Sequence, residues 1–184
     1  MTFYQKCIPH SYRASIFDID YKEIKKQGIV ALFFDLDNTI IGYDEAKLHE
    51  NQVAFINQLK KDFKVIVLSN TNNKRVSLAL SDLDVPFIWY ATKPLKRGFK
   101  KALKMMNVKK EEAIMIGDQL MTDVFGANRI GIKTILVKSV KRKSDRKITR
   151  FNRIIESFVL KKIQKKYPNL YEERLKQYVI DHTM

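Results

Sequence analysis

Two aspartates that lie two residues apart, Asp35 and Asp37, follow directly after an unbroken apolar run over residues 29–34. Their side chains project to the same side of an extended chain. Carboxylates this close repel one another unless a positive charge lies between or beside them. Mg²⁺ is the usual cation for a protein site made only of oxygen ligands. The pair therefore predicts a Mg²⁺ site at the end of a buried strand.

A second acidic pair follows another short apolar run, residues 113–116. Here Gly117 precedes Asp118, and Asp123 comes five residues later. Glycine has no side chain and allows the backbone to approach a metal closely. We expect Asp118 and Asp123 to supply the remaining oxygen ligands of the same ion.

Polar side chains also follow a third apolar run, residues 65–68. Ser69 and Asn70 come directly after it, and ligands of an open α/β sheet bind at the carboxyl ends of its strands. Ser69 and Asn70 are therefore candidate ligand-binding residues. The next amides, Asn72 and Asn73, are interpreted as an ordinary polar loop.

The elements that position these residues alternate along the chain. Apolar runs bounded by turn residues predict strands, and apolar residues three to four positions apart predict helices. The expected strands are 29–34, 65–68, 87–90, 113–116 and 133–137, and the expected helices between them are 46–61, 74–83 and 97–106. Unbroken apolar runs are typical of strands buried on both faces. The pattern predicts an α/β protein with a mainly parallel central sheet.

Residues 1–20 are expected to be irregular, although they contain another Asp-x-Asp pair, Asp18 and Asp20. This pair follows polar residues and precedes a short helical segment, residues 21–26. Asp20 is predicted to be the N-cap of that helix, with Glu23 three residues further on. We assign no catalytic role to Asp18 or Asp20.

The acidic pairs and the residues between them resemble the four motifs of the haloacid dehalogenase-like (HAD) superfamily, in order. The resemblance rests on the segments Asp35-x-Asp37-x-Thr39, Ser69, Lys93-Pro94 and Gly117-Asp118-x-x-x-x-Asp123. The last segment continues to Asn128-Arg129-x-Gly131, a form similar to the YqeG-type branch of subfamily IIIA. The resemblance covers roughly residues 8–155. It implies a three-layer Rossmann-like fold and a phosphatase that hydrolyses phosphomonoesters.

The resemblance also implies roles for these residues. Asp35 would be the nucleophile that forms an aspartyl-phosphate, and Asp37 the general acid and base. Ser69, with Asn70, would bind the phosphoryl group. Lys93 would neutralise the phosphoryl group and the nucleophile, with Lys96 as the weaker candidate for this position.

The implied cofactor is Mg²⁺. Asp35, the backbone carbonyl of Asp37, and Asp118 would hold the ion, and Asp123 would do so directly or through water.

The short gaps between the motifs leave no room for a cap domain. A helix is expected almost directly after Thr39, and only 23 residues separate Ser69 from Lys93. A capless site cannot exclude water by itself, so the substrate or a partner has to cover it. This favours a macromolecular or lipid substrate. Phosphatidylglycerophosphate is one candidate, because a phosphatase for that lipid belongs to a related branch of the superfamily.

The length of 184 residues and the apolar content of 45% are those of one globular domain, residues 1–184. A basic helical extension is expected over about residues 139–184. The chain carries a net charge of +15, of which the extension contributes +8. RNA and an anionic membrane surface are the candidate partners of such a surface. The rival hypothesis is therefore an RNA- or ribosome-associated binding protein, although the basic runs contain no interleaved aromatic residues.

The extension is predicted to begin with an amphipathic helix that packs on the body of the protein. Its expected buried stripe is Ile148, Phe151, Ile154, Ile155 and Phe158. Pro168 ends the pattern, and residues 171–181 are expected to form a last helix. No apolar run approaches the ~20 residues of a membrane span, and no signal peptide is evident. The expected location is cytoplasmic, with a position peripheral to a membrane as the alternative.

Overall fold

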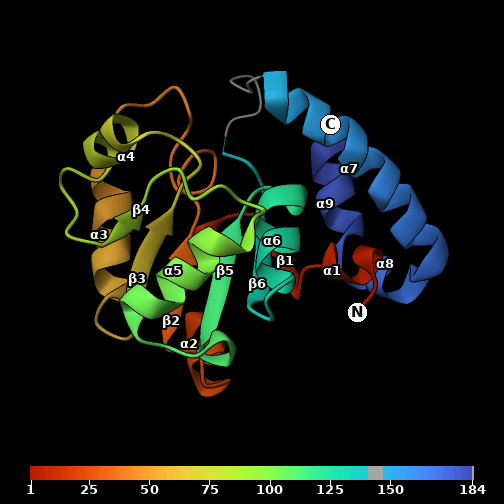
Figure 1. The fold of residues 1–184 in the computed structure, drawn as a ribbon, viewed down its shortest axis with the longest axis horizontal. Coiled ribbons are helices and arrows are strands. Elements are labelled where there is room, and N and C mark those ends of the chain that lie inside the picture. The colour runs from red at the N-terminus through yellow and green to blue at the C-terminus, as the bar shows by residue number, and fades with distance from the viewer. Residues whose placement is uncertain (141–146, 184) are drawn as a thin grey trace.

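Six parallel strands form one sheet in the computed structural model, which describes the backbone of residues 1–140 and 147–183 (Figure 1). Side chains are described for residues 1–140 and 155–182. Across the sheet the strands are β1 (Ser11–Arg13), β6 (Lys133–Val137), β5 (Ala113–Gly117), β2 (Ala31–Phe34), β3 (Lys64–Leu68) and β4 (Phe87–Ile88). The predicted α/β fold with a parallel sheet is confirmed.

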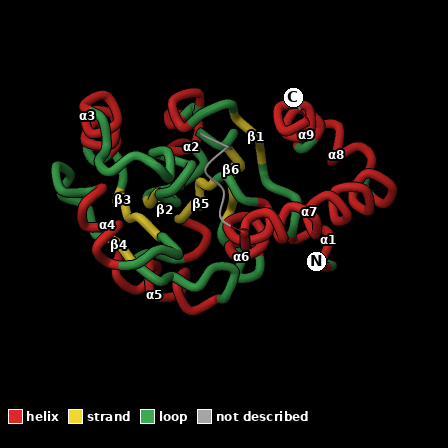
Figure 2. Tube along the Cα trace, turned by 90° about the horizontal axis from the view of Figure 1, so that it is seen from above, coloured by secondary structure: helices red, strands yellow, loops and turns green. Residues whose placement is uncertain are grey.

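Helices cover both faces of the sheet and complete three layers (Figure 2). One face carries α2 (Tyr21–Lys26), α3 (Glu50–Leu59) and α4 (Asn73–Ala79), and the other carries α5 (Lys96–Met106) and α6 (Phe125–Asn128). Alternate residues of β2 divide between the faces: Leu32 and Phe34 pack with the first set, Ala31 and Phe33 with the second. All four are fully buried. Burial on both faces explains why this strand has no polar residue.

The order of the strands places the ends of β2, β3 and β5 together. Phe34, the last residue of β2, pairs with Val67 on one side and with Ile116 on the other. The chain runs from β2 outward through β3 to β4 and then returns to β5 on the opposite side of β2. The sheet therefore has its topological switch point between β2 and β5, where open α/β sheets bind ligands.

No additional domain is inserted beside the sheet within residues 1–140. The connection from β2 to α3 is a loop, and the connection from β3 to α5 contains only α4 and β4. This agrees with the capless arrangement predicted from the motif spacing.

The N-terminal region differs from the prediction of irregular chain. It contains α1 (Phe3–Lys6), the edge strand β1 and a 3₁₀ turn (Ile16–Asp18). β1 is an edge strand of three residues that pairs with β6. It has no long apolar run of the kind that marks the central strands, and for this reason the sequence did not indicate it. Asp20 caps α2 by accepting a hydrogen bond from the Glu23 N–H at 2.9 Å, as predicted.

Three other predicted elements differ from the structure in their bounds. β4 stops at Ile88 because Tyr90 lies in the left-handed region, with φ of 44°, and bends the chain out of the sheet. The predicted helix 46–61 begins only at Glu50. The predicted last helix, 171–181, is divided into α8 (Pro168–Arg174) and α9 (Lys176–Thr183).

The C-terminal helices pack against β6 and β1 at one edge of the sheet. With α1 and the turn after β5 they bury a third apolar cluster, whose C-terminal members are Val159, Ile163, Tyr171, Leu175 and Tyr178. The first two of these lie on α7 (Lys147–Lys166).

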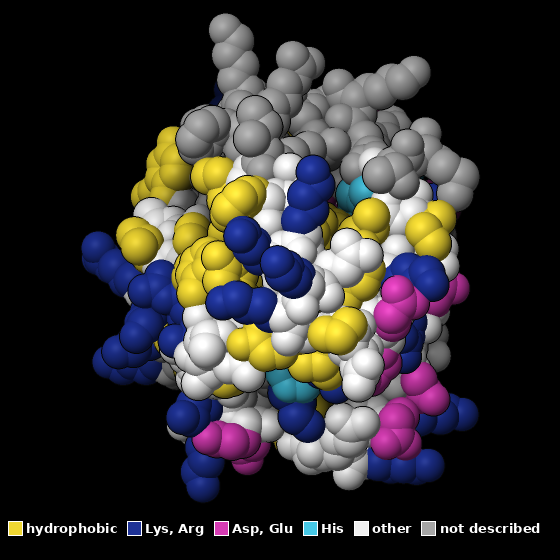
Figure 3. Space-filling view, turned by 90° about the vertical axis from the view of Figure 1, so that its right-hand side faces the viewer, with side chains coloured by type: hydrophobic (Ala, Val, Ile, Leu, Met, Phe, Trp, Pro, Cys, Tyr) yellow, Lys and Arg dark blue, Asp and Glu magenta, His cyan; other side chains and the backbone are white. Residues whose placement is uncertain are grey.

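The predicted buried stripe of α7 is wrong for the two members whose side chains are described. Phe158 is 58% exposed and Ile155 is 37% exposed, because Val159 and Ile163 face the body instead. Ile148, Phe151 and Ile154 lie outside the described side chains. Figure 3 shows the resulting surface, on which apolar side chains and Lys or Arg side chains are mixed.

None of the helices that the structure describes is long and apolar enough to cross a membrane.

Replacing a side chain by Ala should change the stability of the protein by different amounts on the two sides of α7. Ile163 is fully buried, so Ile163→Ala should lower the free energy of unfolding by about 2–5 kcal/mol. Phe158→Ala removes a larger but exposed side chain and should change it by less than about 0.5 kcal/mol. Urea unfolding of both variants measures the difference. An equal loss in the two variants would mean that Phe158, not only Ile163, packs against the body.

Candidate active site

A buried lysine lies between two buried aspartates at the carboxyl end of β2. The Lys93 Nζ is 2.6 Å from Asp35 Oδ1 and 2.7 Å from Asp123 Oδ1. Asp35 is the first residue after β2, and its N–H donates to the carbonyl of Ile116 on β5. Burial favours the neutral amine, but the charges of Asp123 and Asp35 outweigh it and raise the pKa of Lys93. The lysine therefore remains a cation at the centre of the site.

Three carboxylates converge at this point: Asp35, Asp118 and Asp123. Each is almost completely buried, and one oxygen of each lies within 4.8 Å of the others. Burial, with the charges of Asp35 and Asp123, raises the pKa of Asp118 well above its ordinary value. Burial likewise raises the pKa of Asp123, to about 6, although Lys93 opposes the shift.

The charges of this cluster are not balanced by the protein alone. With all three carboxylates ionised, the one lysine would leave two negative charges in a buried volume, and buried charges need a partner. A divalent cation supplies that balance. An all-oxygen donor set suits Mg²⁺, so the residues present fit the predicted metal.

Hydroxyl groups hold the Asp118 carboxylate from two sides. Thr39 Oγ1 donates to Asp118 Oδ1 at 3.2 Å, and Ser139 Oγ donates to Asp118 Oδ2 at 2.6 Å. Asp118 follows β5, while Ser139 comes from the segment after β6. These bonds favour the ionised carboxylate and fix its direction.

Gly117 makes room for Asp123. A Cβ atom on Gly117 would lie 2.4 Å from Asp123 Cγ, far inside contact distance. Asp123 is in a π-helical turn (Leu120–Val124), and its Oδ2 accepts a hydrogen bond from the Gln119 N–H at 3.1 Å. The sequence prediction connected Gly117 with a close approach of the backbone to the metal, but the structure connects it with Asp123.

Asn70 is bound to the backbone of Lys93. Its Oδ1 accepts from the Lys93 N–H at 2.8 Å, and its Nδ2 donates to the Lys93 carbonyl at 2.9 Å. These two bonds join the loop after β3 to the loop after β4 and hold Lys93 in place. One N–H of the Asn70 amide is left for another acceptor. Lys96, the weaker candidate, is exposed at the start of α5.

Ser69 and Thr71 present paired hydroxyl groups at the end of β3. Their oxygens are 2.7 Å apart, and the Thr71 N–H donates to Ser69 Oγ at 3.1 Å. Both residues are buried. Hydroxyl groups and a lysine around a common space suit a phosphoryl group, which accepts hydrogen bonds from all of them.

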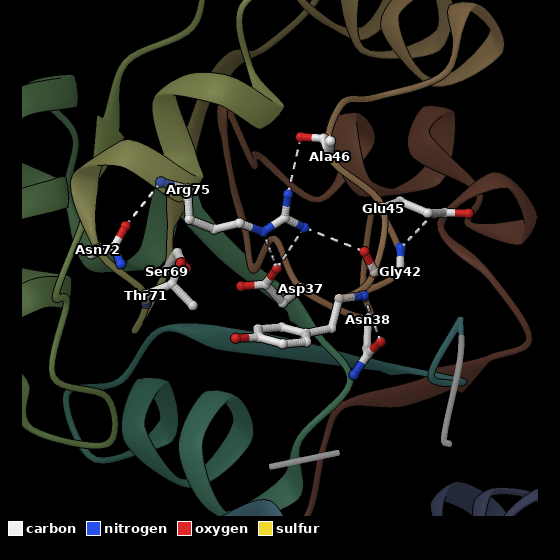
Figure 4. A network of polar contacts seen from close by, with 10 residues as sticks. Asp37, Asn38, Gly42, Glu45, Ala46, Ser69, Thr71, Asn72 and Arg75 are labelled. Atoms are coloured by element: carbon white, nitrogen blue, oxygen red, sulfur yellow. Dashed lines mark hydrogen bonds and ion pairs between the residues drawn. The ribbon is translucent and has the colours of Figure 1, made fainter. Parts of the chain in front are cut away.

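Asp37 is paired with Arg75 of α4 (Figure 4). Arg75 Nε and Nη2 donate to Asp37 Oδ1 at 3.1 and 2.9 Å. Burial and the charge of Asp35 raise the pKa of Asp37, and Arg75 opposes this shift. Asp37 Oδ2 is buried and has no hydrogen-bond partner among the described residues.

The structure thus brings together all seven predicted site residues at one end of the sheet: Asp35, Asp37, Ser69, Asn70, Lys93, Asp118 and Asp123. Sequence reasoning assigned no role to Thr71, Arg75 or Ser139. Thr71 and Ser139 could have been noticed as hydroxyl residues just after strands. Arg75 had no distinguishing signal among 35 lysines and arginines.

Comparison with known families agrees with this geometry. The model of the haloacid dehalogenase-like hydrolases matches residues 6–131. This is well over half of the chain, and it includes all seven predicted site residues. The chain belongs to the haloacid dehalogenase-like hydrolases and is a HAD-type phosphatase.

Among individual relatives, the chain is 38% identical over 167 residues to the "Probable phosphatase YqeG" of Bacillus subtilis, covering 90% of this chain and 96% of that protein. It is also 23% identical over 168 residues to the "Phosphatidylglycerophosphate phosphatase 1, chloroplastic/mitochondrial" of Arabidopsis thaliana. That match covers 86% of this chain but only 48% of the plant protein.

A solved structure shares the fold. It is a HAD family enzyme of Bacteroides thetaiotaomicron, an Asp12Ala mutant in complex with magnesium and inorganic phosphate. The TM-score is 0.51 with 14% identity, over 64% of this chain and 98% of that chain. At this identity the likeness extends to the fold alone.

The unbalanced charge of the cluster predicts a specific response to Mg²⁺. Mg²⁺ that binds the folded state alone stabilises it by RT ln(1 + [Mg²⁺]/Kd), and each kcal/mol of this stabilisation should raise the melting temperature by about 2–4 °C. Asp118→Asn removes one ligand and one buried charge, so this variant should melt at the same or a higher temperature without Mg²⁺ and should lose the Mg²⁺-dependent rise. Differential scanning calorimetry with Mg²⁺ or with a chelator measures both effects.

Asp84→Asn is the matched control, since Asp84 is exposed and lies outside the cluster. It should keep the whole Mg²⁺-dependent rise. If Mg²⁺ stabilises Asp118→Asn as much as the unaltered protein, Asp118 is not a ligand.

Proposed function

We propose that this protein is a Mg²⁺-dependent phosphomonoester hydrolase that acts through an aspartyl-phosphate on Asp35. The observation that supports this most strongly is the position of the Asp35 carboxylate. It lies at the end of β2, 2.6 Å from a buried lysine and beside two further buried carboxylates. A carboxylate can attack a phosphate monoester only where positive charge offsets their repulsion. Lys93 supplies part of that charge in this site.

The bound Mg²⁺, held by Asp35, the backbone carbonyl of Asp37, Asp118 and Asp123, would screen the phosphoryl oxygens and orient them for in-line attack. Ser69 binds the transferring group, with the free N–H of Asn70 as a further donor. Lys93 neutralises the phosphoryl charge. Asn70 holds Lys93 within reach of the phosphoryl group through its two hydrogen bonds to the Lys93 backbone.

Phosphoryl transfer then proceeds in two steps. Asp35 Oδ attacks phosphorus, its new O–P bond replaces the bond to the leaving oxygen, and Asp37 gives that oxygen its proton. The alcohol departs. Water then attacks the phosphorus of the aspartyl-phosphate and gives a proton to Asp37, and phosphate leaves Asp35. The raised pKa of Asp37 suits a group that both gives and takes a proton.

This role for Asp35 predicts that Asp35→Asn abolishes turnover while the fold is retained, because an amide is a poor nucleophile. The matched control is the other Asp-x-Asp pair. Asp18→Asn with Asp20→Asn should keep full activity and lose at most about 1 kcal/mol of stability, because Asn caps a helix about as well as Asp does. Phosphate release from an aryl phosphate, with circular dichroism of each variant, provides the comparison. An active, folded Asp35→Asn protein would exclude the proposed nucleophile.

Phosphatidylglycerophosphate is the candidate substrate that specific observations favour. The similarity to the plant phosphatase extends over most of this chain. In addition, Phe158 of α7 is exposed, and the Nζ of Lys162 lies 5.4 Å from the centroid of its ring. Lysines with exposed aromatic residues suit an anionic membrane surface. A capless site allows a phosphorylated headgroup to enter from that surface.

The basic side of α7 can be tested separately from the site. Replacing Lys161, Lys162, Lys165 and Lys166 with Gln removes charge but no buried side chain. Hydrolysis of a small aryl phosphate should therefore be unchanged. Binding to phosphatidylglycerol vesicles should weaken and should depend less steeply on salt.

Two results would contradict the membrane hypothesis. One is equal vesicle binding by the two proteins, which would make the lysines an ordinary solvated surface. The other is loss of binding to RNA but not to vesicles, which would favour the rival RNA-binding function.

A further inference from the structure

Arg75 joins the loop after β2 to the start of α4. In addition to its two bonds to Asp37 Oδ1, its Nη1 donates to the Ala46 carbonyl at 3.1 Å and its Nη2 to the Gly42 carbonyl at 3.3 Å. The guanidinium therefore contacts the carboxylate and two points of the same loop at once (Figure 4). Its side chain is only 16% exposed.

The guanidinium has little capacity left for a substrate. Of its five N–H groups, which form a rigid fork, these contacts use four. The three acceptor atoms, Asp37 Oδ1 and the carbonyls of Ala46 and Gly42, all belong to the protein. Arg75 is thus arranged to hold protein atoms in place, and it is not arranged as a ligand for the phosphoryl group.

The pairing makes the two oxygens of Asp37 different from one another. Oδ1 accepts both hydrogen bonds from Arg75, whereas Oδ2 is buried without a partner among the described residues. In Figure 4, Oδ2 points away from Arg75 and toward the side on which Ser69 and Thr71 lie. The unpartnered oxygen therefore faces the place proposed for the phosphoryl group.

We propose that Arg75 is a positioning residue that aims Asp37 Oδ2 at the leaving oxygen of the substrate. Because Arg75 occupies Oδ1, the proton that Asp37 transfers is carried on Oδ2 only. The same contacts prevent rotation of the carboxylate. By holding the Gly42 and Ala46 carbonyls, Arg75 also fixes the loop that carries Asp37. The inference rests on the proposed function, in which Asp37 protonates the leaving group.

Varying the leaving group of the substrate separates a loss of proton transfer from a loss of activity that is the same for every substrate. Phenyl phosphate has a poor leaving group that needs a proton, whereas dinitrophenyl phosphate has a good one that does not. The value of kcat/KM reports the steps up to release of the leaving group, where Asp37 acts as the acid. Arg75→Lys keeps the charge but cannot reproduce the two-pronged contact with Asp37.

We expect Arg75→Lys to lower kcat/KM about 10- to 100-fold for phenyl phosphate and less than about threefold for dinitrophenyl phosphate. In an Asp37→Asn background the same substitution should have no further leaving-group effect, because the group that it positions is gone. Lys74→Ala is the matched control, because the Lys74 side chain is exposed on the same helix. This variant should keep kcat/KM unchanged for both phenyl phosphate and dinitrophenyl phosphate.

Equal losses on the two substrates would overturn the inference and leave Arg75 as a residue that only holds the loop. Melting temperatures of the variants identify any that fail to fold, and Arg75→Gln, which keeps one donor for Asp37, then replaces Arg75→Lys in the same comparison. Asp35→Asn is assayed in parallel. If that variant still releases phosphate, the proposed function itself is wrong. If it is inactive while Arg75→Lys shows equal losses, only the role of Arg75 is wrong.

Discussion

The uncompensated negative charge at the end of β2 is the constraint on which the rest of this structure depends. Asp35, Asp118 and Asp123 are buried together, and Lys93 balances only one of them. Such an arrangement costs free energy in the folded protein, and the raised pKa values of Asp118 and Asp123 reflect that cost. A cation of charge two would remove the imbalance, so the cluster has a physical reason to bind one.

The fold holds these charges together by joining the loops at one edge of the sheet. Thr39 and Ser139 bring segments after β2 and β6 onto Asp118, and Asn70 connects the loops after β3 and β4 through Lys93. Arg75 extends the same network to α4. The ligands thus come from loops that the parallel strands bring to one edge, and the buried strands below supply rigidity.

Much of this was predictable from the sequence, because the informative residues stand where strands end. The run before Asp35 indicates a strand buried on both faces, and Asp118 follows a second such run. Short or solvent-facing features were harder to predict. β1 has three residues and no apolar run. On α7, apolar residues occur on more than one side, and spacing alone selected Phe158 instead of Ile163. Arg75 becomes significant only when α4 packs beside the loop after β2, a contact that no local pattern encodes.

The most direct test of the account is to identify the residue that carries phosphate during turnover. Borohydride reduces an acyl phosphate, so quenching the working enzyme with it converts a phosphorylated aspartate into homoserine, which mass spectrometry locates. The account predicts that this change appears at Asp35, only when substrate and Mg²⁺ are both present. Homoserine at any other aspartate, or its absence from an enzyme that is releasing phosphate, would contradict it.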